Sequence, residues 1–579
     1  MTLALYRLGR AAVRRRRFVL AAWVVAALLV IGLGQASGGK TSDAFEIPGV
    51  EAQHALDLLQ DEFPSAAGTS AQLVFAAPDG GSLDDSQAAA AVETALADVD
   101  DQPDVEHVGD LHQSPDGRVA FADVQYSRPS DEIRVAAFER LEATAATADR
   151  SGAVQMELGG DLPSEAVQPE FGGQELIGLA VAMVVLLVAF GSLVAMGLPI
   201  GLAVVGLMTS MGLITLVASV IDVSSVAPTI ASMIGLGVGI DYALFIVTRH
   251  RENLRLGMTV EEAVGRAIAT SGAAVLFAGI TVMIAISGLA IAGITLVTVM
   301  GLMAALTVAV MVAIALTLLP ALLGFAGHKV DQTSLRVPRW LGGRKGSQRL
   351  AVSRSDVHQT PGRESLWHRW GAQVAAHPWR YLILGVAALA LLTAPLFSLR
   401  LGSPDNGTQA ESLTTRRAYD LLADGFGPGF NGPLLLSVEL DGAATGDTTV
   451  LDRLRRAIDA DPQVDSVAPA QVNEAGTAAV LQVVPNTSPQ DQATTELVHR
   501  LRSDVIPATL GTAGDGDTGG DVQVYVGGQT AMFIDLSDKV ESRLPWFIGA
   551  VLLLSVLLLT VVFRSIVVPL KAAVMNLLS

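Results

Sequence analysis

The chain has no cysteine among its 579 residues, and only 16% of its residues are charged and 5% aromatic. The lack of cysteine excludes a disulfide framework and a thiolate metal site. Nucleophilic serine elbows and spaced zinc ligands are also missing from the sequence. We therefore expect neither an enzyme nor a metal or nucleic-acid binder. The scarcity of charge, beside 51% hydrophobic residues, disfavours a soluble protein.

The hydrophobic residues gather in runs long enough to cross a bilayer, which takes about 20 apolar residues. The first run, 18–34, follows four consecutive arginines and is predicted to be a retained span. A signal peptide is the alternative, because Ala36 and Ser37 could form a small-residue cleavage site. Seven more spans are predicted at 176–190, 198–220, 226–248, 273–291, 296–325, 379–399 and 546–563.

Short loops rich in arginine and lysine stay on the cytoplasmic side of a membrane. Basic residues cluster at Arg14–Arg17, after the fourth span from Arg249 to Arg255, and between 336 and 349. These clusters predict a multi-pass protein of the bacterial cytoplasmic (inner) membrane with its N-terminus inside. The long hydrophilic segments then lie outside, and the first is strongly acidic, with about 27 acidic residues against about 6 basic ones.

These observations predict an α-helical polytopic membrane protein with two extracytoplasmic domains. Helical patterns at 50–63, 86–99 and 132–147 alternate with strand patterns at 71–76, 105–108, 120–124 and 154–158, which indicates α+β modules of the split βαβ kind. The strand pairing stays open. The expected segments are the N-terminus with its span (1–34), the first outer domain (35–173), five spans (174–325), a basic cytoplasmic linker (326–378), a span (379–399), the second outer domain (400–544), a span (545–563) and the start of a ninth (564–579).

An internal repeat relates the two halves. Residues 55–59, followed by Phe63, resemble residues 418–422, followed by Phe426, and 190–194 resemble 563–567. Parallel repeats in a membrane protein suggest two halves around an axis along the membrane normal, with a pathway between them.

The sharpest chemical feature is Asp241, which lies about eight residues, or roughly 12 Å of helix, from Arg249. A carboxyl group so deep in an apolar span is costly and usually marks an ion or proton route, with Tyr242 as a neutral hydroxyl neighbour. The alternative is a structural acid that hydrogen-bonds across the bundle. Thr281 and Ser287 are the candidate hydrogen-bond partners. Three glycines without side-chain bulk, which allow close helix packing, precede the acid at Gly235, Gly237 and Gly239.

The stretch from Gly239 to Val247, with Arg249, Arg251-Glu252 and residues 270–272, resembles the fourth and fifth helices of the MMPL (mycobacterial membrane protein large) family, within the resistance-nodulation-division superfamily. The resemblance covers nearly the whole chain. It implies proton-driven export of lipids or similar hydrophobic molecules, with Asp241 and Tyr242 as one of two proton-relay pairs and no cofactor beyond the proton motive force. Substrate and membrane lipids would be its partners.

The sequence departs from the family pattern because the second relay pair and about four later spans would lie beyond Ser579. We expect a truncated product, since the sequence ends inside an apparent helix. A separately encoded second-half chain, or a homo-oligomer, is the other possibility. A second functional class therefore stays open: a non-transporting remnant or membrane scaffold whose outer domains bind partners.

Overall fold

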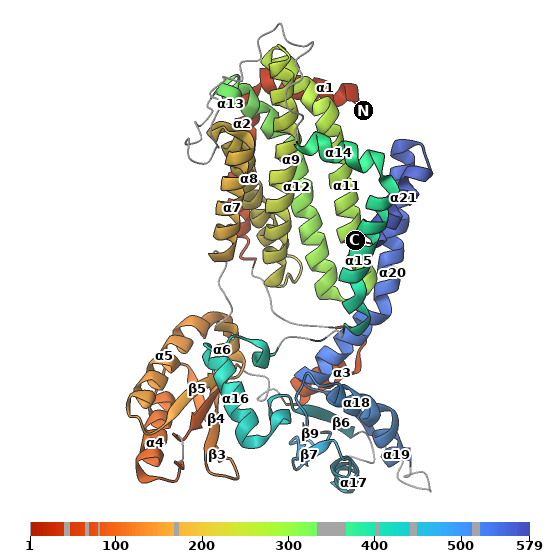
Figure 1. Cartoon of the computed structure of the whole chain (residues 1–579). Helices are drawn as coiled ribbons and strands as arrows, with labels where there is room; N and C mark the ends of the chain where they lie inside the picture. Colours follow the sequence, from red (N-terminus) through yellow and green to blue (C-terminus); the bar gives the residue numbers. More distant parts are fainter. Residues whose placement is uncertain are drawn as a thin grey trace. The chain divides into compact units, whose positions relative to one another are not determined.

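The computed structural model describes residues 2–39, 47–63, 69–78, 81–128, 130–166, 173–332, 366–399, 402, 405–440, 448–511 and 522–578. The chain divides into two compact units (Figure 1). A membrane unit comprises Met1–Phe45, Phe171–Arg400 and Arg543–Ser579, and an outer unit comprises Glu46–Glu170 and Leu401–Ser542. Most of the predicted basic linker lies outside the described residues.

Seven helices in the described part of the chain are long and apolar enough to cross a membrane. They are α2 (Arg16–Ala36), α8 (Leu193–Val217), α9 (Val226–Arg255), the continuous Val260–Ala292 that contains α10 and α11, α12 (Thr295–Ala326), Pro378–Leu396 that contains α15, and α20 (Gln529–Phe563). The remaining predicted span corresponds to α7 (Gly173–Phe190), whose apolar part, Ile177–Phe190, is shorter than the others. The final stretch forms α21 (Val567–Leu578).

The helix α12 forms the core of the membrane unit. It packs against α2, α8, α9, α11 (Ala273–Ser287) and the N-terminal α1 (Thr2–Arg14). Its sequence is hydrophobic on every side, as expected for a helix that has neighbours all round. Shorter helices complete the unit: α10 (Val260–Ala267), α13 (Lys329–Gln332), α14 (Leu366–Ala376) and α15 (Pro378–Thr393).

Polar contacts fasten α1 to α10. Arg10 and Arg14 both reach the carboxylate of Glu261 at 2.7 Å, and the hydroxyl of Tyr6 donates to Glu262 at 2.6 Å. Thr259 caps α10, because its hydroxyl accepts the backbone N–H of Glu262. The chain then continues through a π-helical turn, Ile268–Gly272, into α11, so α1 is linked to the start of this span.

The first outer module is an antiparallel sheet covered by helices on one face. The chain passes through β1 (Ser70–Ala76), α4 (Ser86–Asp100), β2 (Val105–Val108), β3 (His112–Gln113), β4 (Val119–Tyr126), α5 (Ser130–Arg150), β5 (Gln155–Gly159) and α6 (Asp161–Ala166). The strand order is β2-β4-β1-β5, with β3 on β4, and Val74 lies opposite Phe121. The predicted succession of helices and strands is confirmed. The short β3 and α6 were not expected.

The second module repeats this strand order. It contains β6 (Leu434–Leu440), α17 (Thr448–Asp459), β7 (Val464–Val467), β8 (Gln471–Val472), β9 (Ala478–Pro485), α18 (Gln492–Arg500), α19 (Ile506–Gly511) and β10 (Val522–Gly527). Its sheet runs β10-β6-β9-β7, with β8 on β9. Alternate β6 residues from Leu434 to Leu440 are buried, the period-two pattern of a strand with a buried face.

Each sheet is also packed against one helix from the other half of the sequence. The helix α3 (Glu51–Glu62) packs against β6 and β10, whereas α16 (Thr414–Phe426) packs against β1, β4 and β5 (Figure 1). Equivalent contacts hold both helices. Glu51 accepts the N–H of Val526 at 2.8 Å, and Thr414 accepts the N–H of Leu158, also at 2.8 Å. The two modules are therefore interlocked.

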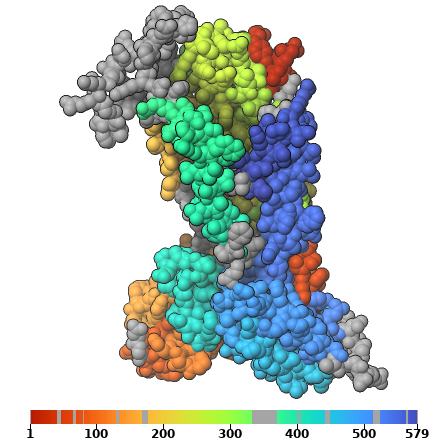
Figure 2. Space-filling view, turned by 45° about the vertical axis from the view of Figure 1, so that its right-hand side comes forward, coloured from red at the N-terminus to blue at the C-terminus, as the bar shows by residue number. Residues whose placement is uncertain are grey.

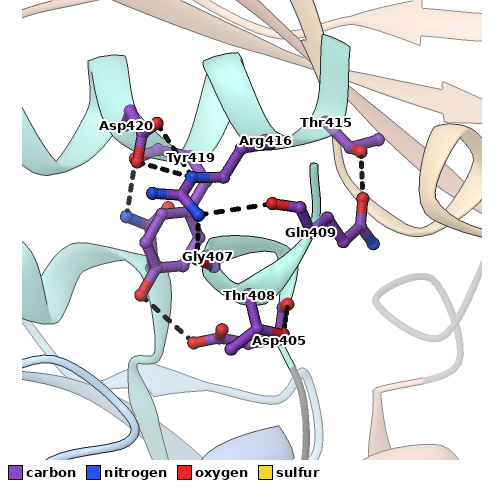
Figure 3. A network of polar contacts seen from close by, with 9 residues as sticks. Asp405, Gly407, Thr408, Gln409, Thr415, Arg416, Tyr419 and Asp420 are labelled. Atoms are coloured by element: carbon purple, nitrogen blue, oxygen red, sulfur yellow. Dashed lines mark hydrogen bonds and ion pairs between the residues drawn. The ribbon is translucent and has the colours of Figure 1, made fainter. Parts of the chain in front are cut away.

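The segment before α16 folds back onto this helix (Figure 3). Arg416 pairs with Asp420 at 2.9 Å and also donates to the carbonyls of Gly407 and Gln409. Tyr419 donates to Asp405 at 3.1 Å, and burial beside this carboxylate raises the pKa of the Tyr419 hydroxyl. These bonds hold the segment from Asp405 to Gln409 against α16.

Candidate functional site

The candidate site centres on Asp241, at the midpoint of α9. This helix has 30 residues, so it is about 45 Å long and Asp241 lies about 22 Å from either end. The hydrocarbon core of a bilayer is about 30 Å thick. If α9 crosses a bilayer symmetrically, the carboxyl group therefore lies near the centre of the apolar layer.

Asp241 lies on the face of α9 that the described helices leave exposed. Met233, Gly237 and Phe245, spaced four residues apart around it, share this exposure. Within the described part of the chain, the Asp241 carboxylate makes neither a hydrogen bond nor an ion pair. The acid therefore does not face the interior of the described helices.

Tyr242 points in a different direction, because consecutive residues of a helix are turned by about 100°. Its side chain is only 5% exposed, and its ring packs beside Gly279 of α11, 3.6 Å from where a Cβ atom would stand. No group in the described residues accepts or donates a hydrogen bond at its buried hydroxyl. Asp241 and Tyr242 thus lie on different sides of α9.

The three glycines before Asp241 have different surroundings. A Cβ atom on Gly235 would stand 2.7 Å from a methyl group of Thr307, and one on Gly239 would stand 2.9 Å from the sulfur of Met311. Both glycines therefore allow α12 to approach α9 closely. Gly237 has nothing within 4 Å of its Cβ position and lies one turn before Asp241 on the exposed face.

Thr281 and Ser287 both belong to α11, but neither bonds to Asp241 or Tyr242 among the described residues. The Thr281 hydroxyl donates instead to the carbonyl of Phe277, one turn earlier, at 2.8 Å. Thr281 lines a cavity between α11, α20 and α21, while Ser287 ends α11. Neither residue therefore supports the alternative in which Asp241 is a structural acid hydrogen-bonded across the bundle.

The structure adds residues that sequence reasoning missed. The thioether of Met311 occupies the space left by Gly206, Gly235 and Gly239, so one side chain of α12 joins α8 and α9. His250, nine residues after Asp241, is fully buried, and its ring nitrogens lack hydrogen-bond partners in the described part. Gly206 and Gly279 could have been suspected as small residues in apolar spans. Nothing in the sequence singled out Met311, since methionine is common in apolar helices.

Several membrane-length helices, a mid-helix acid and two α+β modules define a multi-pass membrane protein of the transporter type. The sequence matches the model of the MMPL family over residues 44–381 and 434–578, so the chain belongs to the MMPL family of membrane transporters. The resemblance carried by the Asp-Tyr stretch of α9 is thereby confirmed.

Known relatives extend over the whole chain. It is 36% identical to the membrane protein YdfJ of Bacillus subtilis over 578 residues, 99% of this chain and 75% of that protein. It is 29% identical to the mycolic acid-containing lipids exporter MmpL11 of Mycolicibacterium smegmatis, over 97% of this chain and 58% of that protein. It is 28% identical to the heme uptake protein MmpL11 of Mycobacterium tuberculosis, over 99% of this chain and 58% of that protein. The chain thus spans little more than half the length of the two MmpL11 proteins.

Proposed function

We propose that this chain acts in proton-coupled export of lipids or other hydrophobic and amphiphilic molecules across the bacterial cytoplasmic membrane. One observation carries the proposal: a carboxyl group stands at the middle of a membrane-length helix without a cationic partner in the described structure. Acids at such depth are rare, and they usually lie on ion or proton routes.

The chemistry of a proton step fits this arrangement. A carboxylate fixed by an arginine stays ionised, whereas one in an apolar layer without a cation can exist in its neutral form. Asp241 could then bind a proton from one side of the membrane and release it to the other. Tyr242, whose buried hydroxyl has no bond in the described part, is the neighbouring group that we assign to the relay.

The substrate class is inferred from the relatives and from the apolar setting. The names of the two MmpL11 proteins specify export of mycolic acid-containing lipids in one organism and heme uptake in another. Both cargoes have large hydrophobic parts, but the two named directions differ. We propose export for this chain, and transport assays in both directions test that assignment.

The outer modules support a parallel internal repeat. Their sheets share one strand order, and Glu51 and Thr414, at corresponding helix starts, each accept a backbone N–H from the last strand of the other module. We assign substrate capture to these modules, with the N-terminus of the chain in the cytosol.

Substitution of Asp241 by Asn tests the proton step, because the amide keeps the shape of the side chain but cannot ionise. We expect at least a 100-fold loss of proton-gradient-driven transport of a fluorescent lipid in proteoliposomes, about the contribution of one proton-transfer group. Thermal stability should hardly change. Asp222→Asn is the matched control, since Asp222 is an exposed acid between α8 and α9.

Three outcomes separate the interpretations. Export lost in Asp241→Asn but kept in Asp222→Asn supports the relay. Undiminished export in Asp241→Asn would show that the acid is structural. If the unmodified chain moves no lipid in either direction under a proton gradient, the scaffold interpretation prevails.

A further inference from the structure

A cavity of about 330 Å³ lies between α11, α20 and α21 in the membrane unit. Such a volume is at the lower end of the range for small-molecule sites, about 300–1,000 Å³. Its walls are mostly isoleucine, leucine, valine and phenylalanine side chains. Thr281, Ile284 and Ala285 of α11 form one wall, and residues between Phe547 and Leu558 of α20 form the facing wall.

Gly288 lies beside the cavity, close to two of the α20 residues that line it. This glycine follows α11 directly, and a Cβ atom there would stand 3.2 Å from a Val551 methyl group and 3.5 Å from the ring of Phe547. The chain directly after α11 therefore lies close to α20 at this glycine. Figure 2 shows α20 and α21, in blue, at the surface of the membrane unit, where lipid tails can reach them.

The length of the cavity suits one lipid tail. Its wall on α20 extends over twelve residues from Phe547 to Leu558, a helix rise of about 16 Å. This is roughly half of the ~30 Å hydrocarbon core, the depth occupied by the tails of one leaflet.

The walls also favour a hydrocarbon rather than a polar ligand. Nine of the twelve lining residues are apolar, and the polar ones are Thr281, Ser555 and Asn576. The Thr281 hydroxyl is already bonded to the Phe277 carbonyl, so it does not require a polar group from a ligand. An empty space between leucine and isoleucine side chains loses dispersion contacts, which a methylene chain restores.

We propose that this cavity binds one acyl chain of a membrane amphiphile, either a bilayer phospholipid or a free fatty acid. The same part of α11 also contacts the relay region, because Gly279 lies beside Tyr242 and Thr281, two residues later, lines the cavity. An acyl chain thus packs against one side of α11 and Tyr242 against the other. Binding itself does not depend on the proposed proton step.

Photo-crosslinking tests the site in the purified full chain. A phosphatidylethanolamine with a diazirine near the middle of one tail is used in liposomes, and a diazirine fatty acid is used in detergent micelles. Labelled residues are located by mass spectrometry. We expect labels on 281–285 and 547–558 at least fivefold above those on the exposed Leu391 and Leu392 of α15. The probe that labels identifies the source of the chain.

A cavity-filling substitution provides the specific control. Ala285→Phe places a ring in the cavity and should lower labelling of 547–558 at least fivefold. Ala278→Phe adds the same ring on α11 two turns earlier, at an exposed position outside the cavity, and should leave labelling unchanged. Equal labelling in both variants would overturn the proposal.

Saturation provides a test on the unmodified chain, should Ala285→Phe fail to fold. Excess unlabelled fatty acid in micelles should suppress labelling of the cavity residues but not of Leu391. Labelling that does not saturate, or that is uniform over all exposed helices, would show ordinary contact with bulk lipid and would also overturn the proposal. The labelling experiment does not depend on the proton step. Its outcomes are therefore the same whether or not Asp241→Asn abolishes export.

Discussion

The outer unit and the membrane unit differ in how they hold their acids. In the outer unit, the buried acids Glu157, Asp461 and Asp535 each pair with an arginine. Arg417 reaches Glu157 at 2.6 Å, and Arg500 reaches Asp461 at 2.8 Å with a second bond from the same guanidinium. In the membrane unit, Asp241 has no such partner among the described residues.

This difference separates two uses of a carboxyl group. A carboxylate clamped by a guanidinium is held ionised and joins elements that are distant in the sequence, as Glu157 joins β5 to α16. Such a pair stabilises a fold but cannot easily exchange a proton. An acid without a cation contributes little to packing and can change its charge. Asp241→Asn, described above, should therefore reduce transport far more than stability, with the largest effect of all the substitutions considered.

Removal of one arginine from the outer unit should have the opposite effect to Asp241→Asn, because it should mainly reduce stability. Arg417→Met leaves the buried Glu157 carboxylate without its cation. Because the arginine is itself partly exposed, we expect the outer unit to lose about 1–3 kcal/mol of unfolding free energy. Chemical denaturation of the full chain measures this loss. Arg456→Met, which removes an exposed arginine of α17, is the control and should change little.

The double variant Arg417→Met, Glu157→Gln sharpens the comparison. Without the charge on Glu157, most of the lost stability should return, since the penalty arises from an uncompensated buried charge. A double variant as unstable as Arg417→Met would mean that packing of the arginine stem, rather than the ion pair, holds α16 to the sheet.

Of the glycines near Asp241, one should lose stability when it is replaced by alanine and another should not. Gly235→Ala forces a methyl group within 2.7 Å of Thr307, and we expect overpacking to cost about 1–3 kcal/mol. Gly237→Ala meets open space and should stay within about 0.5 kcal/mol of the unmodified chain. Thermal unfolding in detergent compares the two. Equal losses would contradict the close approach of α9 and α12.

The smallest expected effect concerns pH. The hydrogen bonds from Arg500 lower the pKa of Asp461, so its folded-state pKa lies below the unfolded value of about 3.9. The pair therefore stabilises the folded state above this pH, and its contribution is lost as the pH falls through the folded-state pKa. Asp461→Asn should lower the Tm of the outer unit by about 2–4 °C at pH 7.

That difference should shrink progressively below about pH 4, where the unmodified carboxyl group also becomes neutral. Differential scanning calorimetry at several pH values measures the change. A difference that is constant from pH 7 down to pH 3 would show that the amide disrupts packing, because loss of charge would then not be its cause.

The sequence by itself determined the class of this protein and most of its elements. Runs of about 20 apolar residues can be buried only in lipid or in a large core, so seven of the eight predicted spans recur as membrane-length helices. The alternation of helix and strand periods fixed the order of elements in the first outer module from α3 to β5. The Asp-Tyr stretch of α9 was enough to indicate the MMPL family.

Only the tertiary structure decided which elements meet. Strand order, and the exchange of α3 and α16 between the two sheets, depend on contacts between residues hundreds of positions apart, which no local period encodes. The same holds for the site. Helical period alone turns Asp241 and Tyr242 to different sides of α9, but only the positions of α11 and α12 show that Tyr242 is covered while Asp241 is exposed. Whether a side chain is buried depends on the helices that pack beside it, and the local sequence does not specify which helices these are.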